Sequence, residues 1–158
     1  MKITCFMYAS LDGRIDCAMT EKIDPEAKAY YTHIASFGDF TQINGKTTNA
    51  MHYAENGVFE AKNYRACGET FFKAEDAAGY QVCMDTKGTL LWNTNLVDGK
   101  PLIVVTSENA GAEYLDYLKS KKISYITCGA EKIDLKKTVA VLEKEFGVKK
   151  AVITGGGH

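Results

Sequence analysis

The sequence predicts an α/β fold in which helices cover both faces of a mainly parallel β-sheet. From residue 101 onward, apolar β-branched segments alternate with amphipathic segments, which is the order strand, helix, strand, helix, strand. The first segment, residues 3–9, is a continuous apolar run, as expected for a strand covered on both faces. The composition, with 158 residues, 46% hydrophobic and 25% charged, suffices for one core, so we expect a single domain over 1–158.

The individual elements follow from periodicity and from turn or cap residues. Strands are predicted over 3–9, 40–43, 80–84, 89–92, 102–106, 123–127 and 149–154. A helix over 27–36 is predicted after Asp24–Pro25–Glu26, where an N-cap candidate and a proline begin the first turn, with Ala27, Tyr30, Tyr31 and Ile34 as its apolar face. A second helix is predicted over 112–121. Residues 85–88 form a turn between two strands, and 51–79 shows no sustained period.

The helix over 135–146 has the clearest pattern. Its inward face is formed by apolar residues at helical spacing, namely Leu135, Val139, Leu142 and Phe146. Asp134 stands at the N-cap position, and Gly147 stands where a helix commonly ends.

Charge and cysteine content exclude several classes. Nineteen basic against twenty acidic residues give a net charge of −1, so nothing favours nucleic acid or a membrane surface as a partner. The five cysteines lack a C-x-x-C pair, which favours a reducing, cytoplasmic setting with Cys5, Cys83 and Cys128 in the core. The three histidines have no metal-ligand spacing, so no metal is expected.

Glycines at the end of the last predicted strand form the strongest local motif. The apolar run 151–154 leads directly into Gly155, Gly156 and Gly157. Ligands collect at the carboxyl ends of strands in α/β sheets, and glycine lets backbone N–H groups approach a phosphate. A cofactor carrying a diphosphate would fit there; a flexible tail is the alternative.

A second phosphate-binding candidate follows the 40–43 strand. Gly45, Lys46 and Thr47 match the end of a P-loop, but that motif requires glycine where Phe40 stands, so no ATPase is predicted. Lys46 can still supply a charge, and Thr47 or Thr48 can donate hydrogen bonds to a phosphate oxygen. The alternative is a solvated turn at a strand-to-loop junction.

Thr106 and Ser107 end the 102–106 strand, where an adenosine ribose or its phosphate could be bound. The same serine could equally cap a helix. Neither G-x-G-x-x-G nor G-x-S-x-G occurs, which argues against a standard dinucleotide fingerprint and a hydrolase nucleophile.

Taken in order, the short motifs resemble a known family. The sequence resembles the C-terminal reductase domain of the riboflavin-pathway deaminase-reductases over nearly its whole length. The motifs that carry the resemblance are residues 9–15, Gly45–Lys46–x–Thr48, Asp85–x–x–Gly88, residues 104–107, Cys128–Gly129, Asp134–Leu135, residues 146–148 and residues 155–157.

The resemblance implies a fold and an activity. Such domains have a dihydrofolate reductase-like fold, a three-layer αβα sandwich around a mostly parallel mixed sheet. They reduce a pyrimidine or pterin-like small-molecule substrate with NADPH, and they commonly form homodimers. In that family the glycine loop leads into a further helix and closing strands, so we expect this chain to lack those C-terminal strands.

The resemblance also assigns roles to residues. Gly155, Gly156 and Gly157 would cradle the cofactor diphosphate, with Gly45, Lys46 and Thr48 holding phosphate from the facing loop. Thr106 and Ser107 would lie near the adenosine 2′-phosphate. Ser10, Leu11 and Asp12 would border the nicotinamide and the substrate. Asp12 is the nearest carboxyl group that could supply a proton, with a turn-forming aspartate as the alternative.

Two departures from the family pattern bear on the substrate. Phe6 stands where the family commonly carries a lysine, and His52 and Glu55 stand where an acid followed by Asn-Pro is common. Both would weaken the anchoring of a ribose phosphate. They keep a second function open, a nucleotide-cofactor-binding protein of the same fold with a different reductase activity or none.

Overall fold

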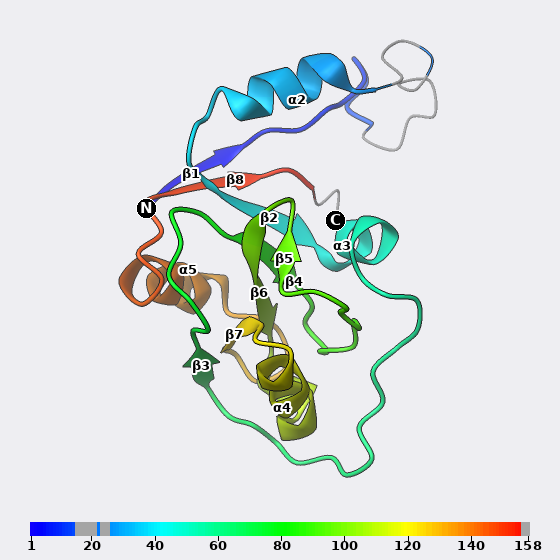
Figure 1. Cartoon of the computed structure of the whole chain (residues 1–158), viewed down its shortest axis with the longest axis vertical. Coiled ribbons are helices and arrows are strands. Elements are labelled where there is room, and N and C mark those ends of the chain that lie inside the picture. The colour runs from blue at the N-terminus through cyan, green and yellow to red at the C-terminus, as the bar shows by residue number, and fades with distance from the viewer. Residues whose placement is uncertain (15–21, 23–25, 156–158) are drawn as a thin grey trace.

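The protein is built around one eight-stranded sheet (Figure 1). The computed structural model describes residues 1–14, 22 and 26–155. Its strands are β1 (Lys2–Cys5), β2 (Thr41–Gly45), β3 (Thr70–Phe72), β4 (Gln81–Met84), β5 (Leu96–Val97), β6 (Lys100–Thr106), β7 (Ser124–Thr127) and β8 (Lys150–Ile153). Its helices are α2 (Lys28–Ala35), α3 (Lys46–His52), α4 (Ala112–Ser120) and α5 (Leu135–Lys144), with a 3₁₀ turn η1 (Glu108–Ala110).

The sheet is mostly parallel, as predicted. Its strand order is β1-β8-β2-β4-β6-β7-β3, with β5 paired to β6 beside this path. The pairs from β1 through β7 are parallel, whereas β3 runs antiparallel to β7 and β5 runs antiparallel to β6. Parallel neighbours place the carboxyl ends of β8, β2, β4 and β6 at one edge of the sheet.

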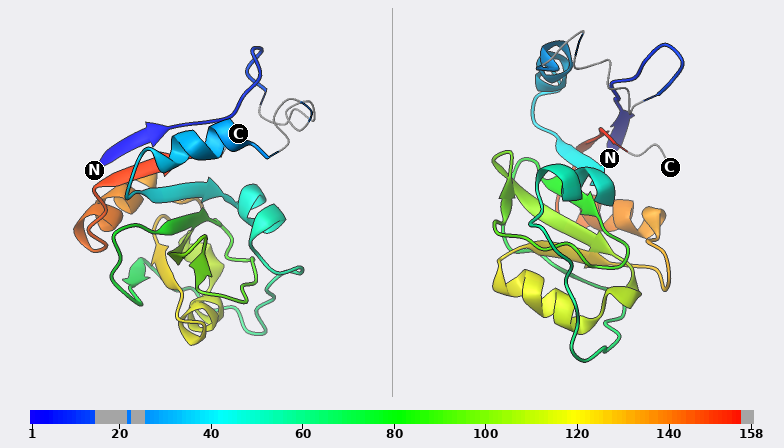
Figure 2. Two further views of the ribbon diagram at one scale, coloured as in Figure 1. Left: turned by 45° about the horizontal axis from the view of Figure 1, so that its top comes forward. Right: turned by 90° about the vertical axis from the view of Figure 1, so that its right-hand side faces the viewer.

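Helices cover both faces of the sheet, which confirms the three-layer αβα sandwich. Figure 2 shows α4 and α5 on opposite sides of the strands. The first face packs Leu102 and Val104 of β6 against Leu115 and Leu118 of α4. On the other face, Val82, Ile103, Ile126 and their neighbours pack near Leu142 of α5. Alternation along the buried strands therefore supplies apolar side chains to both layers.

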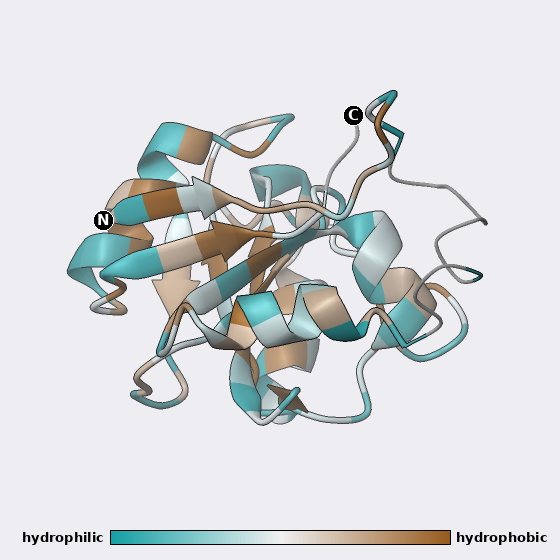
Figure 3. Ribbon diagram, turned by 90° about the horizontal axis from the view of Figure 1, so that it is seen from above, coloured by the Kyte–Doolittle hydropathy of each residue, from teal (hydrophilic) through white to brown (hydrophobic). Residues whose placement is uncertain are grey.

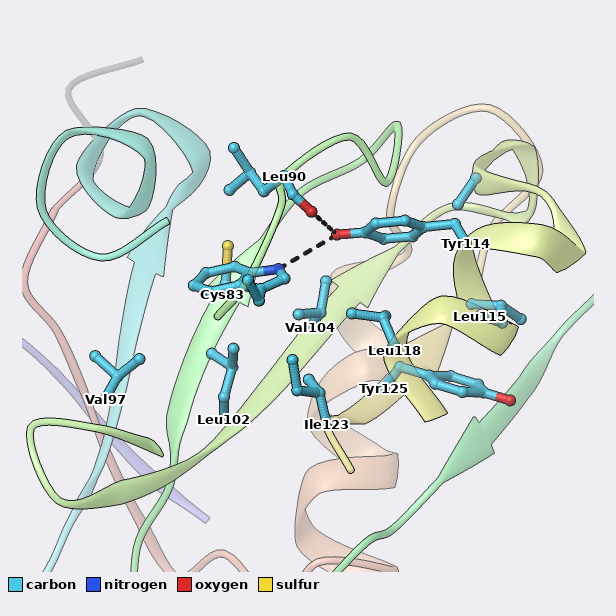
Figure 4. Close-up of a cluster of buried hydrophobic side chains, with 12 residues drawn as sticks. Cys83, Leu90, Val97, Leu102, Val104, Tyr114, Leu115, Leu118, Ile123 and Tyr125 are labelled. Atoms are coloured by element: carbon cyan, nitrogen blue, oxygen red, sulfur yellow. Dashed lines mark hydrogen bonds between the residues drawn. The ribbon is translucent and has the colours of Figure 1, made fainter. Parts of the chain in front are cut away.

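The α4 side of the core contains a hydrogen-bonded aromatic pair (Figure 4). The Tyr114 hydroxyl donates to the Leu90 carbonyl at 2.9 Å and accepts from Trp92 Nε1 at 3.4 Å. Tyr114 and Trp92 are both fully buried. Their polar atoms are thus paired inside the core, which keeps burial of these large rings favourable.

The caps predicted for α5 are confirmed. The Asp134 carboxylate accepts from the backbone N–H groups of Lys136 and Lys137, both at 3.0 Å, and Gly147 has a φ of +67° just beyond the helix. Leu142 and Phe146 are buried. Leu135 is 63% exposed, so the prediction that it lies on the inward face was wrong. It is the first residue of the helix, at the end of the layer.

The first strand is shorter and more exposed than predicted. β1 ends at Cys5, and among the described residues it pairs with β8 alone, so it forms a sheet edge. Ile3 is 43% exposed and Cys5 is exposed. Cys83 and Cys128 are buried as predicted, whereas Cys5 is not a core residue. Hydrophobic residues are otherwise concentrated in the strands (Figure 3).

Residues 89–92 do not form the strand expected to follow the 85–88 turn. Among the described residues, this segment has one isolated bridge, between Leu91 and Glu55, and β4 pairs in parallel with β2 and β6. Leu90 and Trp92 are nevertheless buried against α4. Buried and partly buried side chains therefore alternate along this irregular segment, which gives its sequence the pattern of a strand.

The helix predicted over 27–36 is present as α2, with a weaker apolar face. Asp24 and Pro25, the predicted start, lie outside the described residues. Ala27 has a φ of +44° and precedes the helix. Tyr31 is 63% exposed, and no residue of α2 is fully buried. The helix is attached through stacking of Phe6 on Tyr30, with ring centroids 5.3 Å apart.

The segment without a clear period, 51–79, contains only β3 as a named strand. In the described part of the chain, no helix is long and apolar enough to cross a membrane.

Candidate functional site

The candidate site lies at the carboxyl ends of β8 and β2, which are neighbours in the sheet. Ile153 is in register with Ile43, so Gly155 and the start of α3 come together. A Cβ atom added to Gly155 would lie 3.0 Å from Thr48 Oγ1 and 3.7 Å from Asn44 Oδ1. Glycine therefore permits a close approach of the two chain segments. Gly156 and Gly157 lie outside the described residues.

Gly45, Lys46, Thr47 and Thr48 connect β2 directly to α3. Gly45 is the N-cap residue, and Lys46 begins the helix, so the predicted strand-to-loop junction is a strand-to-helix junction. Lys46 and Thr47 are exposed, and Thr48 is partly buried. Of these residues, Thr48 stands beside Gly155, at the edge where the sequence predicted phosphate binding.

Lys46 is held by two groups from the loop after β4. Its Nζ lies 3.4 Å from Asp85 Oδ1 and donates to the Thr89 hydroxyl. The Lys46 side chain is 45% exposed, whereas Asp85 is fully buried. The ammonium group is therefore oriented by a buried carboxylate while remaining accessible to solvent.

Asp85 is a residue of this site whose role the sequence did not identify. Its Oδ2 accepts from the backbone N–H groups of Thr89, at 2.6 Å, and Leu90, at 2.9 Å. Its Oδ1 has no hydrogen-bond partner and faces Lys46. An aspartate directly after a buried strand was the available signal. The pattern indicated turn chemistry and formed part of a family motif, but it assigned this residue no role at the site.

Asn44 and Thr154 were also missed as a linked pair. The Thr154 hydroxyl donates to Asn44 Oδ1 at 2.5 Å and accepts from Gln42 Nε2 at 2.9 Å. Asn44 is 1% exposed, and its Nδ2 has no partner. The ends of β2 and β8 are therefore joined by side chains as well as by the backbone ladder.

Ser10, Leu11 and Asp12 form an exposed turn after β1. The Ser10 hydroxyl donates to the Asp12 carboxylate, and the Gly13 N–H donates to the Ser10 carbonyl at 2.9 Å. The Leu11 side chain is fully exposed. The Asp12 carboxylate thus serves the turn here, which is the alternative that the Asp-Gly sequence left open.

Thr106 and Ser107 lie at the end of β6, both fully buried. The Thr106 hydroxyl donates to the Ser107 carbonyl at 3.0 Å, and the Ser107 hydroxyl donates to the Thr86 carbonyl at 2.9 Å. Ser107 Oγ also accepts from the Asn109 N–H at 3.3 Å and so caps η1. Both hydroxyl protons are already engaged within the protein.

Two tyrosines near the β8 end have perturbed ionisation. Burial raises the pKa of Tyr30, and the Thr154 hydroxyl partly opposes that shift. Burial, together with the hydrogen bond to Asp98 Oδ2 at 2.8 Å, raises the pKa of Tyr53 strongly. Both phenols are therefore neutral at physiological pH. No cluster of potential metal ligands occurs among the described residues.

The residues present fit an anionic nucleotide. Gly155 has no side chain where a Cβ atom would lie 3.0 Å from Thr48 Oγ1. The exposed residues Lys46 and Thr47, in the same first turn of α3 as Thr48, offer a cation and a hydroxyl. Oxygen acceptors of a phosphate need such donors. The three-layer arrangement with this mostly parallel sheet is a dihydrofolate reductase-like fold.

The chain belongs to the RibD C-terminal domain family, whose model matches residues 1–158. This is a family of NAD(P)H-dependent reductases that typically use NADPH. No curated protein matches the chain significantly.

Two solved structures share the fold. The riboflavin biosynthesis reductase Rib7 of Saccharomyces cerevisiae has 20% sequence identity and a TM-score of 0.60, with 98% of this chain and 62% of that chain covered. A pyrimidine reductase-like protein of Corynebacterium diphtheriae has 12% identity and a TM-score of 0.59, with 98% and 65% covered. The chain therefore spans less than two thirds of the length of either structure.

Proposed function

We propose that this protein is an NADPH-dependent reductase of a pyrimidine or pterin-like substrate. The observation that carries the proposal is the approach of Gly155 to Thr48, which follows Lys46 by two residues in α3, at the strand ends of a RibD C-terminal domain. That position suits the phosphates of a dinucleotide, because parallel strands end there and donors converge. The printed names of the two structural relatives, a riboflavin biosynthesis reductase and a pyrimidine reductase-like protein, support the substrate class.

Lys46, Thr47, Thr48 and the glycines from Gly155 would hold the cofactor. Lys46 is the only one of them with a charge, and Asp85 fixes its direction without enclosing it. Holding a flexible ammonium group in advance lowers the entropy lost when a phosphate binds. The close packing of Gly155 leaves backbone, rather than side-chain, atoms facing the ligand.

Bound NADPH would supply a hydride, so the protein itself needs little acid-base machinery. Its residues would position the two reactants and exclude water from them. We propose that the substrate is bordered by Ser10, Leu11 and Asp12. The Asp12 carboxyl group is the proposed proton donor. In that role the Ser10 hydroxyl would orient the Asp12 carboxylate, as it does in the free turn.

Replacing Lys46 tests the cofactor assignment. We expect Lys46→Ala to weaken NADPH binding about 10- to 100-fold, the effect of losing one hydrogen bond to a charged group. NADPH fluorescence titration measures the dissociation constant. Lys136→Ala, an exposed lysine of α5, is the matched control and should leave it unchanged. Equal affinity of the Lys46→Ala variant and the wild type would contradict the assignment.

A screen of pyrimidine and pterin acceptors with NADPH then separates the two functions. Oxidation of NADPH supports the reductase. Binding of NADPH without turnover of any acceptor would favour the second function, a nucleotide-binding protein of the same fold. The exposure of the turn at residues 10–12 is the observation that favours testing this second function.

A further inference from the structure

The end of β8 is weakly fixed by its backbone. The Thr154 N–H donates to the Ile43 carbonyl at 3.3 Å, which is longer than the usual 2.9–3.0 Å of such bonds. Beyond Ile153 the named strand ends. A backbone bond of this length alone would leave the following glycine free to move relative to β2.

The side chain of Thr154 supplies the missing attachment. Its hydroxyl both donates to Asn44 and accepts from Gln42, two residues of the neighbouring strand β2. Both partners are themselves buried or partly buried, so these bonds are shielded from water. A hydroxyl with one donated and one accepted bond is fixed in rotation and in position.

Asn44 carries an energetic penalty in its buried position, and its hydrogen bond to Thr154 accounts for an asparagine there. Its Nδ2 is buried and unpaired, and an apolar residue of similar size would avoid that penalty. Its Oδ1, however, receives the Thr154 proton, and the same oxygen lies 3.7 Å from the position of a Gly155 Cβ. The amide therefore contributes by holding the chain immediately before Gly155.

We propose that Thr154 is a positioning residue, whose hydroxyl fixes Gly155 against the start of α3 so that the nucleotide meets a prearranged cradle. This inference rests on the proposed function and extends it to a residue outside the phosphate-binding set. Prearrangement raises affinity because less chain ordering remains to be done on binding.

The test compares Thr154→Val, which keeps the shape and removes the hydroxyl, with Thr154→Ser, which keeps the hydroxyl. We expect the valine variant to raise the dissociation constant for NADPH about tenfold. The serine variant should stay within about twofold of the wild type, because it restores the bonds. Thr138→Val is the matched control, since that buried hydroxyl donates to the Asp134 carbonyl at 2.8 Å on α5. It should reduce stability without changing affinity.

Amide hydrogen exchange supplies a second readout that needs no cofactor. Thr154→Val should speed exchange at residues 154 and 155, while Thr154→Ser and Thr138→Val should not. Unchanged NADPH affinity and unchanged exchange in the valine variant would overturn the inference. An equal loss of NADPH affinity in the serine variant would overturn it as well. If the wild type fails to bind NADPH, the proposed function falls, and the exchange comparison still decides whether Thr154 fixes Gly155.

Discussion

Asp85 shows at the scale of one residue how a buried charge is made tolerable. Its carboxylate accepts two backbone N–H bonds and faces the Lys46 ammonium. Burying an ionised carboxylate without such partners would be strongly unfavourable. The same contacts orient Lys46 toward the strand ends, so one side chain serves both stability and the candidate site.

Removing this carboxylate should destabilise the protein. We expect Asp85→Ala to lower the free energy of unfolding by about 2–4 kcal/mol, because the N–H groups of Thr89 and Leu90 lose their acceptor in a buried place. Urea unfolding measures the change. Asp116→Ala, at an exposed position of α4, should have little effect. An Asp85→Ala variant as stable as the wild type would show that the two N–H groups find other partners.

Distance along the chain decides which site residues can be identified from the sequence. Gly45, Lys46, Thr48 and Gly155 could be proposed as candidates from the sequence, because glycines and hydroxyl residues directly follow recognisable strands and parallel strands end at one edge. Thr154 and Asn44 are 110 positions apart, and nothing local to either indicates the bond between them. Their pairing depends on β8 lying beside β2, which is a property of the sheet order.

At the scale of the element, local caps were the most reliable signals. Asp134 and Gly147 bound α5 as predicted, since a cap bonds to N–H groups two or three residues away. Residues 89–92 were misassigned because burial against α4, a long-range contact, produced alternation without strand pairing. α2 was predicted with an apolar face, but its attachment is through stacking of a few aromatic rings.

Ser107 offers a test at this scale, because it caps the short helix η1. We expect Ser107→Ala to lower the free energy of unfolding by about 0.5–2 kcal/mol through loss of that cap. The ratio of the affinities for NADPH and NADH should stay constant, since the hydroxyl proton is already donated to Thr86. A selective loss of NADPH affinity would instead support the predicted contact with the 2′-phosphate. Titration of both cofactors distinguishes the two.

At the scale of the whole molecule, the core layer on the α4 side contains a buried phenol that links stability to pH. Burial, and next the nearby Asp85 charge, raise the pKa of Tyr114 well above its usual value of 10.0. Below pH 10 the phenol is protonated in both the folded and the unfolded chain. Above it the unfolded chain ionises first, so the folded state loses stability as pH rises.

Tyr114→Phe should therefore flatten the decline in stability above pH 10. At neutral pH the same variant should be less stable than the wild type, because the Leu90 carbonyl and Trp92 Nε1 lose their partner. Thermal unfolding from pH 7 to 11 measures both effects. Tyr64→Phe, at a 63% exposed position, is the control and should leave the profile unchanged. A decline equally steep in the Tyr114→Phe variant would assign the alkaline sensitivity to other groups.

The position of β8 between β1 and β2 sets the timing of assembly during synthesis. Lys2 of β1 is in register with Lys150, and in the described residues β1 has no other strand partner. At ordinary rates of translation, β1 waits on the order of ten seconds before its partner leaves the ribosome. The β2–β8 edge that carries Thr48 and Gly155 is completed at the same moment. A nascent chain can therefore pair its other strands early, yet the edge that carries Thr48 and Gly155 forms only after β8 has been synthesised.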